Sequence, residues 1–466
     1  MFRNFTGTTD KPAPAVGKVI ALRPEITPDG SGGSHRVRRD SELSRWLDLK
    51  TRLHERLLEE LNLSAIDKVA PADLRREVGA IVSELLAEEG TALNGRELGS
   101  IVEELLDEVL GLGPLEPLLK DPTVNDILVN THQQVFVERE GLLEITPVRF
   151  KDERHLLRII DRIVSSIGRR IDESQPWVDA RLSDGSRVNA IIPPCALDGP
   201  LLSIRKFSKI PLTMDKLIAH DALTPSMATL LQGIVKARLN LLISGGTGSG
   251  KTTMLNAVSS YIGQRERIIT IEDSAELQLQ QMHVARMETR PPNIEGKGAV
   301  TQRDLVRNAL RMRPDRIVIG EVRGAEALDM LQAMNTGHDG SMTTIHANTP
   351  RDAMGRLEQM IMMTGVEFPL RSMRQQIASA IHVCIQLERM SDGRRRMTSL
   401  QEVTGMEGDV LTMQEIFHFK REGVDRDGRV IGHYAATGIR PRFAERLKGH
   451  GIELSSDLFS TDRVTE

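Results

Sequence analysis

Apolar residues in the first quarter of the chain recur at helical spacing. Three stripes of Leu, Ile and Val keep one face of a helix apolar. They are Leu43, Leu47, Leu53, Leu57 and Leu61, then Leu74, Val78, Ile81 and Leu85, and then Leu98, Ile101, Leu105 and Val109. Pro71 and Gly95 separate the stripes. The pattern predicts a helical bundle over residues 41–111, and the aperiodic residues 1–40 before it read as a disordered tail.

The hydrophobic period shortens after Gly111–Pro114, which indicates strands. Residues 126–130 and 135–138 read as paired strands, and 188–192 and 201–204 as two more. A helical stripe over 156–163 lies among them. We therefore predict a mixed α/β domain over 112–207, followed by a linker over 208–213.

Strands and helices alternate from about Leu212 onwards. Helical stretches separate four short apolar runs, and this alternation favours a parallel sheet with helices on its faces. The runs are 241–243, 268–271, 317–319 and 342–345. Two later runs, 383–387 and 415–419, are expected to extend an edge of the sheet or to form a hairpin. The third predicted domain covers 214–440, with a C-terminal helix or tail over 441–466.

Composition limits the classes of function. The 466 residues are 39% hydrophobic and 27% charged, with a net charge of -4, which is typical of a soluble globular protein and not of a general nucleic-acid binder. Cys195 and Cys384 form no C-x-x-C pair, so a structural zinc is not expected, and we interpret both as buried small apolar residues. The sequence has no apolar run long enough to cross a bilayer and no apolar signal core. It therefore predicts a protein that stays on the cytoplasmic side.

A glycine-rich segment carries the strongest chemical signal. Gly245–Thr252 fits the pattern G-x-x-x-x-G-K-[ST], after an apolar strand and before a helix. In such a loop backbone N–H groups turn towards phosphate oxygens, Lys251 reaches the β- and γ-phosphates, and the Thr252 hydroxyl can bind Mg²⁺. The alternative is a plain glycine-rich turn. The nucleotide-contacting residues we predict are Gly245, Gly246, Thr247, Gly248, Ser249, Gly250, Lys251, Thr252 and Thr253.

Acids and a histidine follow three of the predicted strands. Glu272 and Asp273 follow the second, Glu321 the third and His346 the fourth. Because ligands bind outside the carboxyl ends of parallel strands, these side chains are expected near the phosphate loop. Glu321 is predicted to act as general base or to orient the attacking water. Since Gly320 replaces the usual Asp, Glu272 or Asp273 is expected to serve Mg²⁺, directly or through water.

Histidines and arginines supply further candidates. His338 and His346 are predicted to sense phosphate, with a hydrogen-bonded structural role as the alternative. Arg187 and Arg205 are candidates for arginine fingers, although an isolated arginine is more often a solvated surface charge. Arg394–Arg396 we interpret as a solvated hairpin tip and not as a nucleic-acid patch.

Four motifs in order resemble those of secretion-superfamily ATPases. Residues 245–252, 271–274, 319–324 and 336–348 are similar to the Walker A, Asp box, Walker B and His box of these motors, which power type II and type IV secretion and type IV pili. Residues 320–357 most resemble the CpaF-type ATPases of tight-adherence (Flp) pili. Segments 121–138 and 181–207 also resemble the N-terminal domain of that family.

The resemblance implies a homohexameric ring that uses ATP and Mg²⁺. Each subunit would join a PAS-like N-terminal α/β domain to a RecA-like P-loop ATPase domain with a mainly parallel sheet. Glu321 maps onto the catalytic Glu and Glu272 onto the Asp-box acid, while Arg187 and Arg205 would close over the γ-phosphate. The motor would be peripheral to the inner membrane and would drive pilus assembly through a platform protein, with retraction left open.

Three rival functions remain at this stage. One is a type IV secretion ATPase that exports DNA or protein, which would share the same site chemistry. The second is an inactive nucleotide-binding scaffold, which the full set of motifs disfavours. The third is a DNA-translocating motor, which the acidic balance of the chain disfavours.

Overall fold

Pro71 and Gly95, which separate the predicted helical stripes, are each the first residue of a helix. The computed structural model describes residues 46, 48–54, 56–57, 71–91, 93–139, 141–207, 212–293 and 296–461. The predicted tail, 1–40, and most of the linker, 208–211, lie outside these ranges. The chain divides into two compact units, Met1–Gly113 and Pro114–Glu466.

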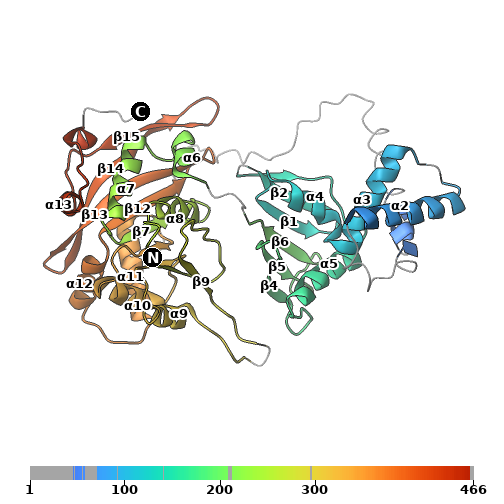
Figure 1. Ribbon diagram of the computed structural model, residues 1–466, viewed down its shortest axis with the longest axis horizontal. Coiled ribbons are helices and arrows are strands. Elements are labelled where there is room, and N and C mark those ends of the chain that lie inside the picture. The colour runs from blue at the N-terminus through green and yellow to red at the C-terminus, as the bar shows by residue number, and fades with distance from the viewer. Residues whose placement is uncertain are drawn as a thin grey trace, which may run out of the picture. The chain divides into compact units, whose positions relative to one another are not determined.

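In the first unit α2 spans Pro71–Glu88 and α3 spans Gly95–Leu110 (Figure 1). Asn94 caps α3 and forms a capping box with Glu97, which satisfies amide groups at the helix start. The apolar faces meet in one core, which also takes in helical residues between 46 and 57. Its members include Leu53, Leu57, Val78, Leu85, Ile101 and Leu105. The predicted helical stripes are confirmed for the residues that the structure describes.

The second unit begins with Gly113–Leu115 (η2) at its boundary and α4, Glu116–Lys120, and continues into a six-stranded antiparallel sheet. Its strands run in the order β3-β2-β1-β6-β5-β4. They are β1 Asp126–Thr131, β2 Gln134–Arg139, β3 Leu142–Ile145, β4 Trp177–Arg181, β5 Arg187–Ile191 and β6 Leu201–Arg205. Helix α5, Glu153–Ser166, buries the apolar stripe that predicted it. The four predicted strands and the helix are confirmed, whereas β3 and β4 were not foreseen.

A nine-stranded sheet forms the rest of the unit, in the order β15-β14-β13-β12-β7-β11-β10-β8-β9. The strands from β12 to β9 in that order are mutually parallel. The prediction is confirmed for β7, β8, β10 and β11, whereas β9 was not foreseen and β12 was expected only to extend an edge or to form a hairpin. They are β7 Leu241–Gly245, β8 Ile268–Glu272, β9 Val284–Glu288, β10 Arg316–Ile319, β11 Met342–Ile345 and β12 Val383–Arg389. An antiparallel meander extends one edge through β13 Arg395–Glu407, β14 Val410–Val424 and β15 Val430–Ala436.

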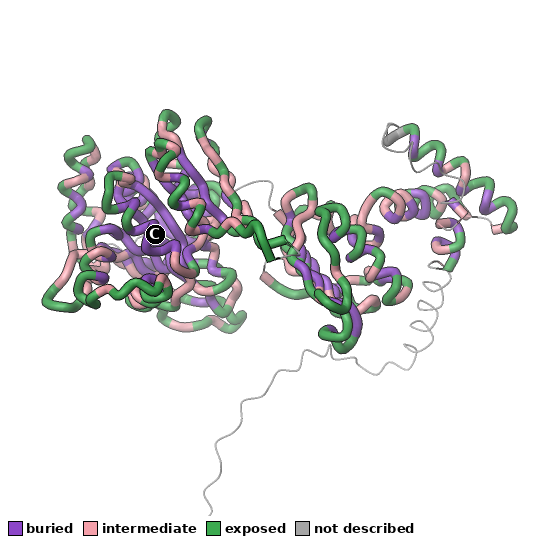
Figure 2. The backbone as a smooth tube through the Cα atoms, turned by 90° about the horizontal axis from the view of Figure 1, so that it is seen from below, coloured by how far each residue is buried: buried purple, intermediate pink, exposed green. Residues whose placement is uncertain are grey.

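Helices cover both faces of this sheet, because side chains of a strand alternate between its faces. Leu241 and Ile243 of β7 join one core with residues of α7 and α8, whereas Leu242 joins a second core with residues of α9 to α12. Figure 2 shows the buried residues gathered in the strands between these layers. The helices are α6 Met214–Ala219, α7 Pro225–Lys236, α8 Lys251–Ser259, α9 Gln302–Ala309, α10 Glu326–Asn335, α11 Pro350–Met362, α12 Leu370–Ala380 and α13 Ala444–Gly449, with a last turn at Ser456–Phe459.

The two cysteines differ in their environment. Cys384 is buried in β12, as predicted, and burial raises the pKa of its thiol to about 12. The prediction was wrong for Cys195, which is exposed in the turn after β5. Among the residues that the structure describes, none of the helices is both long and apolar enough to span a bilayer.

Candidate active site

The glycine-rich segment forms a tight loop between β7, which ends at Gly245, and α8, which begins at Lys251. Gly248 and Gly250 have φ of 70° and 93°, a region that residues with a Cβ seldom adopt. A Cβ on Gly245 would lie 2.6 Å from the Leu387 carbonyl oxygen of the neighbouring strand. The loop therefore needs glycine at these positions, and it leads into the N-terminus of a helix, which favours anions.

Lys251 is buried, with 8% of its surface exposed. Its Nζ donates to the carbonyl oxygens of Gly245, at 3.1 Å, and Gly246, at 3.0 Å, and lies 3.2 Å from His346 Nε2. Burial lowers the pKa of this ammonium group. The Lys251 Nζ thus lies within the loop. Phosphate oxygens of a nucleotide could replace the two carbonyl oxygens as its hydrogen-bond acceptors.

Glu321 lies between two cationic or polar partners just past the end of β10. Its Oε2 is 2.8 Å from Arg323 Nη2, and its Oε1 is 2.9 Å from His346 Nε2. Burial lowers the pKa of His346, and the neighbouring Glu321 carboxylate opposes that effect. Because β10 and β11 are adjacent parallel strands, their ends bring Glu321 and His346 together beside Lys251. Arg323 was not among the residues predicted from sequence, although it follows the predicted general base by only two positions.

Glu272, at the end of β8, is held by the backbone. Its Oε1 accepts hydrogen bonds from the amides of Glu276, at 2.8 Å, and Leu277, at 2.9 Å. Burial raises the pKa of Glu272 to about 7. A Cβ on Gly320 would lie 2.9 Å from Glu272 Cγ. Glycine at 320 therefore follows from the position of Glu272, whose carboxyl group fills the space beside the end of β10.

The side-chain oxygens of Glu272 and Thr252 are of the kind that binds Mg²⁺ in a magnesium–nucleotide complex. Glu272 Oε2 is buried and has no hydrogen-bond partner among the described residues, and Thr252 presents a hydroxyl in the first turn of α8. The described residues contain no group of three or more His, Cys, Asp or Glu side chains that could hold a metal by themselves. P-loop enzymes do not need one, since phosphate oxygens and water complete the coordination. Asp273 is more exposed and lies 3.7 Å from Arg323.

The two predicted arginines lie opposite each other on β5 and β6. Arg187 Nη1 is 2.9 Å from Glu276 Oε1, in the loop that follows Glu272. Arg205 Nε instead pairs with Asp126 Oδ1 of β1, at 3.0 Å. Arg181, which the sequence analysis missed, pairs with Glu288 at 2.8 Å and also donates to Ser274 Oγ. The structure thus brings Arg187 and Arg181 to the segment after β8, whereas Arg205 is engaged within its own sheet.

His338 is not brought to this edge of the sheet. It precedes β11, whereas His346 follows it, so the two histidines flank opposite ends of one strand. The His338 amide donates to the carbonyl oxygen of Ala333 at the end of α10. Within this chain the contacts of His338 are structural and give no support to phosphate sensing.

The hairpin tip at Arg394–Arg396 is only partly the solvated tip that was predicted. β12 and β13 do form a hairpin, and Arg394 is exposed and pairs with Asp221 at 3.0 Å. Arg396, however, is buried, with its guanidinium 4.6 Å from the centre of the Phe419 ring. Arg395 Nε donates to the Gly248 carbonyl oxygen at 2.9 Å. Arg395 is therefore a contact of the phosphate loop that the sequence analysis did not foresee.

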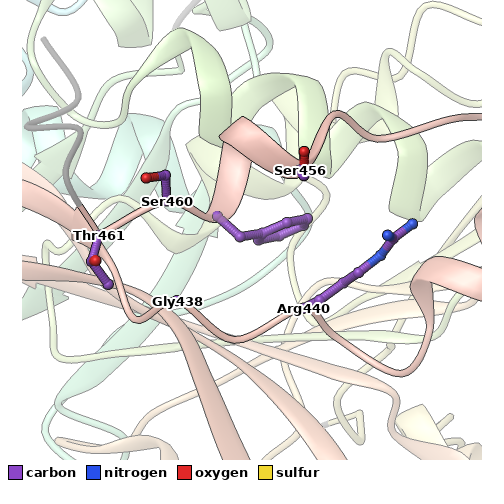
Figure 3. A pocket seen from close by; sticks show the side chains of 6 residues that line it. Gly438, Arg440, Ser456, Ser460 and Thr461 are labelled. Carbon is purple, nitrogen blue, oxygen red and sulfur yellow. The ribbon is translucent and has the colours of Figure 1, made fainter.

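A separate cavity of about 360 Å³ lies near the C-terminal end of the described chain (Figure 3). Its lining consists of Gly438, Arg440, Ser456, Phe459, Ser460 and Thr461. None of these residues belongs to the phosphate loop or to the strand ends beside it, so the predicted chemistry does not depend on this cavity.

A strand, a glycine loop and a helix, with acids at the ends of neighbouring parallel strands, define a P-loop nucleoside-triphosphate hydrolase. The family model described as "Type II/IV secretion system protein" matches residues 108–430, more than half of the chain. The chain belongs to this family and is an ATP-hydrolysing enzyme with a RecA-like fold. A second model, "Type II secretion system protein E, N-terminal domain", matches residues 46–110.

Similar proteins come from secretion and conjugation systems. A putative conjugal transfer protein of Mycobacterium tuberculosis is 40% identical over 333 residues, which cover 70% of this chain and 94% of the relative. The type IV secretion system protein VirB11 of Bartonella quintana is 31% identical over 62% of this chain and 91% of its own length. The crystal structure of the Brucella suis VirB11 ATPase is 28% identical, covers 62% of this chain and 93% of that one, and has a TM-score of 0.34.

Proposed function

We propose that this chain is a hexameric Mg-ATPase motor that powers assembly of a tight-adherence (Flp) pilus. It would work at the cytoplasmic face of the inner membrane through a platform protein embedded there. The observation that carries the proposal is the motif stretch at residues 320–357, which lies inside the region matched by the secretion family and most resembles the pilus branch.

The geometry of the site supports distinct roles for its residues. Lys251 would exchange its carbonyl acceptors for phosphate oxygens, and the loop amides would bind the rest of the triphosphate. Glu321 would accept a proton from the attacking water once Arg323 and His346 no longer occupy both carboxylate oxygens. Thr252 and Glu272 would hold Mg²⁺ directly or through water. When bound, this ion neutralises charge that develops on the phosphates.

Work would come from closure of the N-terminal α/β domain on the nucleotide. Arg187 already contacts Glu276, four residues after the Asp-box Glu272. Exchange of this carboxylate for a γ-phosphate would tie the position of this domain to the nucleotide state. It would also bring a positive charge to the transferring group, as arginine fingers do in other P-loop enzymes. Arg205 would first have to leave Asp126. Sedimentation of the full chain with Mg-ATP is expected to show a particle of six subunits.

A type IV secretion or conjugation ATPase is the second candidate, because the M. tuberculosis and B. quintana relatives carry such names. Both candidates share the hydrolysis site, so the site cannot separate them. The discriminating property is the cargo that the membrane machine moves.

A cellular experiment separates the two. We expect a bacterium that carries Glu321→Gln in this chain to lack surface Flp fibres and to transfer conjugative DNA at the wild-type frequency. Glu445→Gln makes the same chemical change on α13, outside the site, and serves as the control. Intact fibres together with a loss of DNA transfer would replace the pilus assignment with the conjugation assignment. Intact fibres with normal transfer would contradict both.

A further inference from the structure

The hairpin that follows β12 extends beyond the start of the phosphate loop. β12 is parallel to β7, and the last residue in register with it, Leu387, pairs with Gly245, where the loop begins. β12 continues for two more residues to Arg389, and β13 starts at Arg395. Strand register therefore places Arg389 and Arg395, one at each end of this turn, beside the phosphate loop.

Both of these arginines contact the loop at its glycines. Arg395 Nε donates to the Gly248 carbonyl oxygen at 2.9 Å, and its Cδ lies 3.3 Å from the position that a Cβ on Gly250 would occupy. Arg389 Nη1 lies 3.6 Å from the corresponding position on Gly248, while its Nη2 donates to the Gly141 carbonyl oxygen. A side chain on Gly248 or Gly250 would thus project towards the arginines.

Arg389 and Arg395 differ from the other two arginines of the hairpin in the groups that they contact. Arg394 pairs with Asp221, and Arg396 is buried over Phe419. Arg389 and Arg395 donate only to carbonyl oxygens, and no carboxylate among the described residues pairs with either. Two positive charges with no acidic partner in the described part of the chain therefore lie beside a loop that attracts anions through its amides.

We propose that Arg389 and Arg395 bind the phosphate groups of ATP and form the wall of the nucleotide site on the β12 side. A guanidinium carries five N–H donors, so Arg395 can keep its bond to Gly248 and still donate to a phosphate oxygen. The proposal depends on the ATPase activity of the chain and not on the pilus assignment. It assigns nucleotide-binding residues to the C-terminal meander.

The test measures Mg-ATP and Mg-ADP affinity of the full chain, with the hydrolysis step blocked by Glu321→Gln in every protein. In this background Arg395→Ala is expected to weaken binding roughly ten- to hundredfold at low salt, as expected for the loss of a charge-assisted hydrogen bond. Arg389→Ala should weaken it in the same direction, and Arg395→Lys should fall between. Arg394→Ala is the matched control, since its side chain pairs with Asp221, and it should stay within about twofold.

Salt dependence separates phosphate binding from a purely structural role in the loop. Removing a guanidinium that contacts phosphate should make the dissociation constant less sensitive to salt between about 50 and 300 mM, because exposed charges are screened by salt. Affinities within twofold of the parent for both alanine variants would overturn the proposal. So would an affinity loss with an unchanged salt slope, or an equal loss in the Arg394→Ala control. A parent protein that binds no nucleotide would instead contradict the ATPase assignment itself.

Discussion

Substitution of Glu272 by Gln tests whether ionisation of this buried carboxyl group lowers the stability of the folded chain. Glu272 is 3% exposed, and burial raises its pKa from 4.5 to about 7. The folded chain therefore binds this proton more tightly than the unfolded chain does. The stability from this group is fully present below pH 4.5 and is lost as the pH rises through 7. One pKa unit is worth about 1.4 kcal/mol, so ionisation costs about 3 kcal/mol in total.

The amide side chain of the Glu272→Gln variant cannot ionise, yet its oxygen can accept the hydrogen bonds from the Glu276 and Leu277 amides that the Glu272 carboxyl group accepts. Relative to wild type, this variant should gain stability as the pH rises from about 5 to about 8.5. For a domain of this size the gain corresponds to roughly 5–10 °C in melting temperature. Burial of the side-chain NH₂ group of the variant lowers its stability by an amount that does not vary with pH.

Thermal unfolding of the nucleotide-free chain at several pH values measures this difference. Asp273→Asn changes the next carboxyl group, which is 42% exposed, and serves as the control. A difference between Glu272→Gln and wild type that is flat across this pH range would show that ionisation of Glu272 does not destabilise the fold. The cost fits a role for Glu272 with ATP and Mg²⁺, whose positive charge would stabilise the ionised form.

Gly320→Ala should push its Cβ against Glu272 Cγ, 2.9 Å away, and lower kcat about a hundredfold while ATP still binds. Gly79→Ala is the control and should leave kcat unchanged, because its new Cβ meets no described residue within 4 Å. Unchanged kcat in Gly320→Ala would show that Glu272 can move freely. Leu53→Ala removes a fully buried side chain and should destabilise the helical unit by about 2–5 kcal/mol, measured by urea unfolding, without changing the ATPase rate. A parallel loss of ATPase rate would show that the bundle takes part in catalysis.

Local sequence patterns predicted the parts of the site that lie within a few residues of a strand end. The glycine spacing of 245–250 defines the loop, and the buried runs before Glu272, Glu321 and His346 deliver these side chains to one edge. Such features depend on short-range sterics and on the direction of parallel strands. They need no knowledge of which strands are neighbours.

The features that were missed depend on distant pairing. Arg395 and Gly248 are 147 residues apart, and only the register of β12 on β7 brings them together. Glycine at 320 is explained only when β8 is known to lie beside β10. His338 was misplaced because the sequence motif around it runs from the amino end of β11 to beyond its carboxyl end, and a motif in sequence is not a cluster in space.

We propose that the loop after β7 binds a triphosphate and that Glu321 activates water to cleave it. The decisive measurement is phosphate release from Mg-ATP by the purified chain, made together with nucleotide affinity. We predict that Lys251→Ala loses both tight binding and turnover, and that Glu321→Gln binds Mg-ATP but releases no phosphate. Turnover at the wild-type rate in either variant would show that the residue changed does not have the role proposed for it.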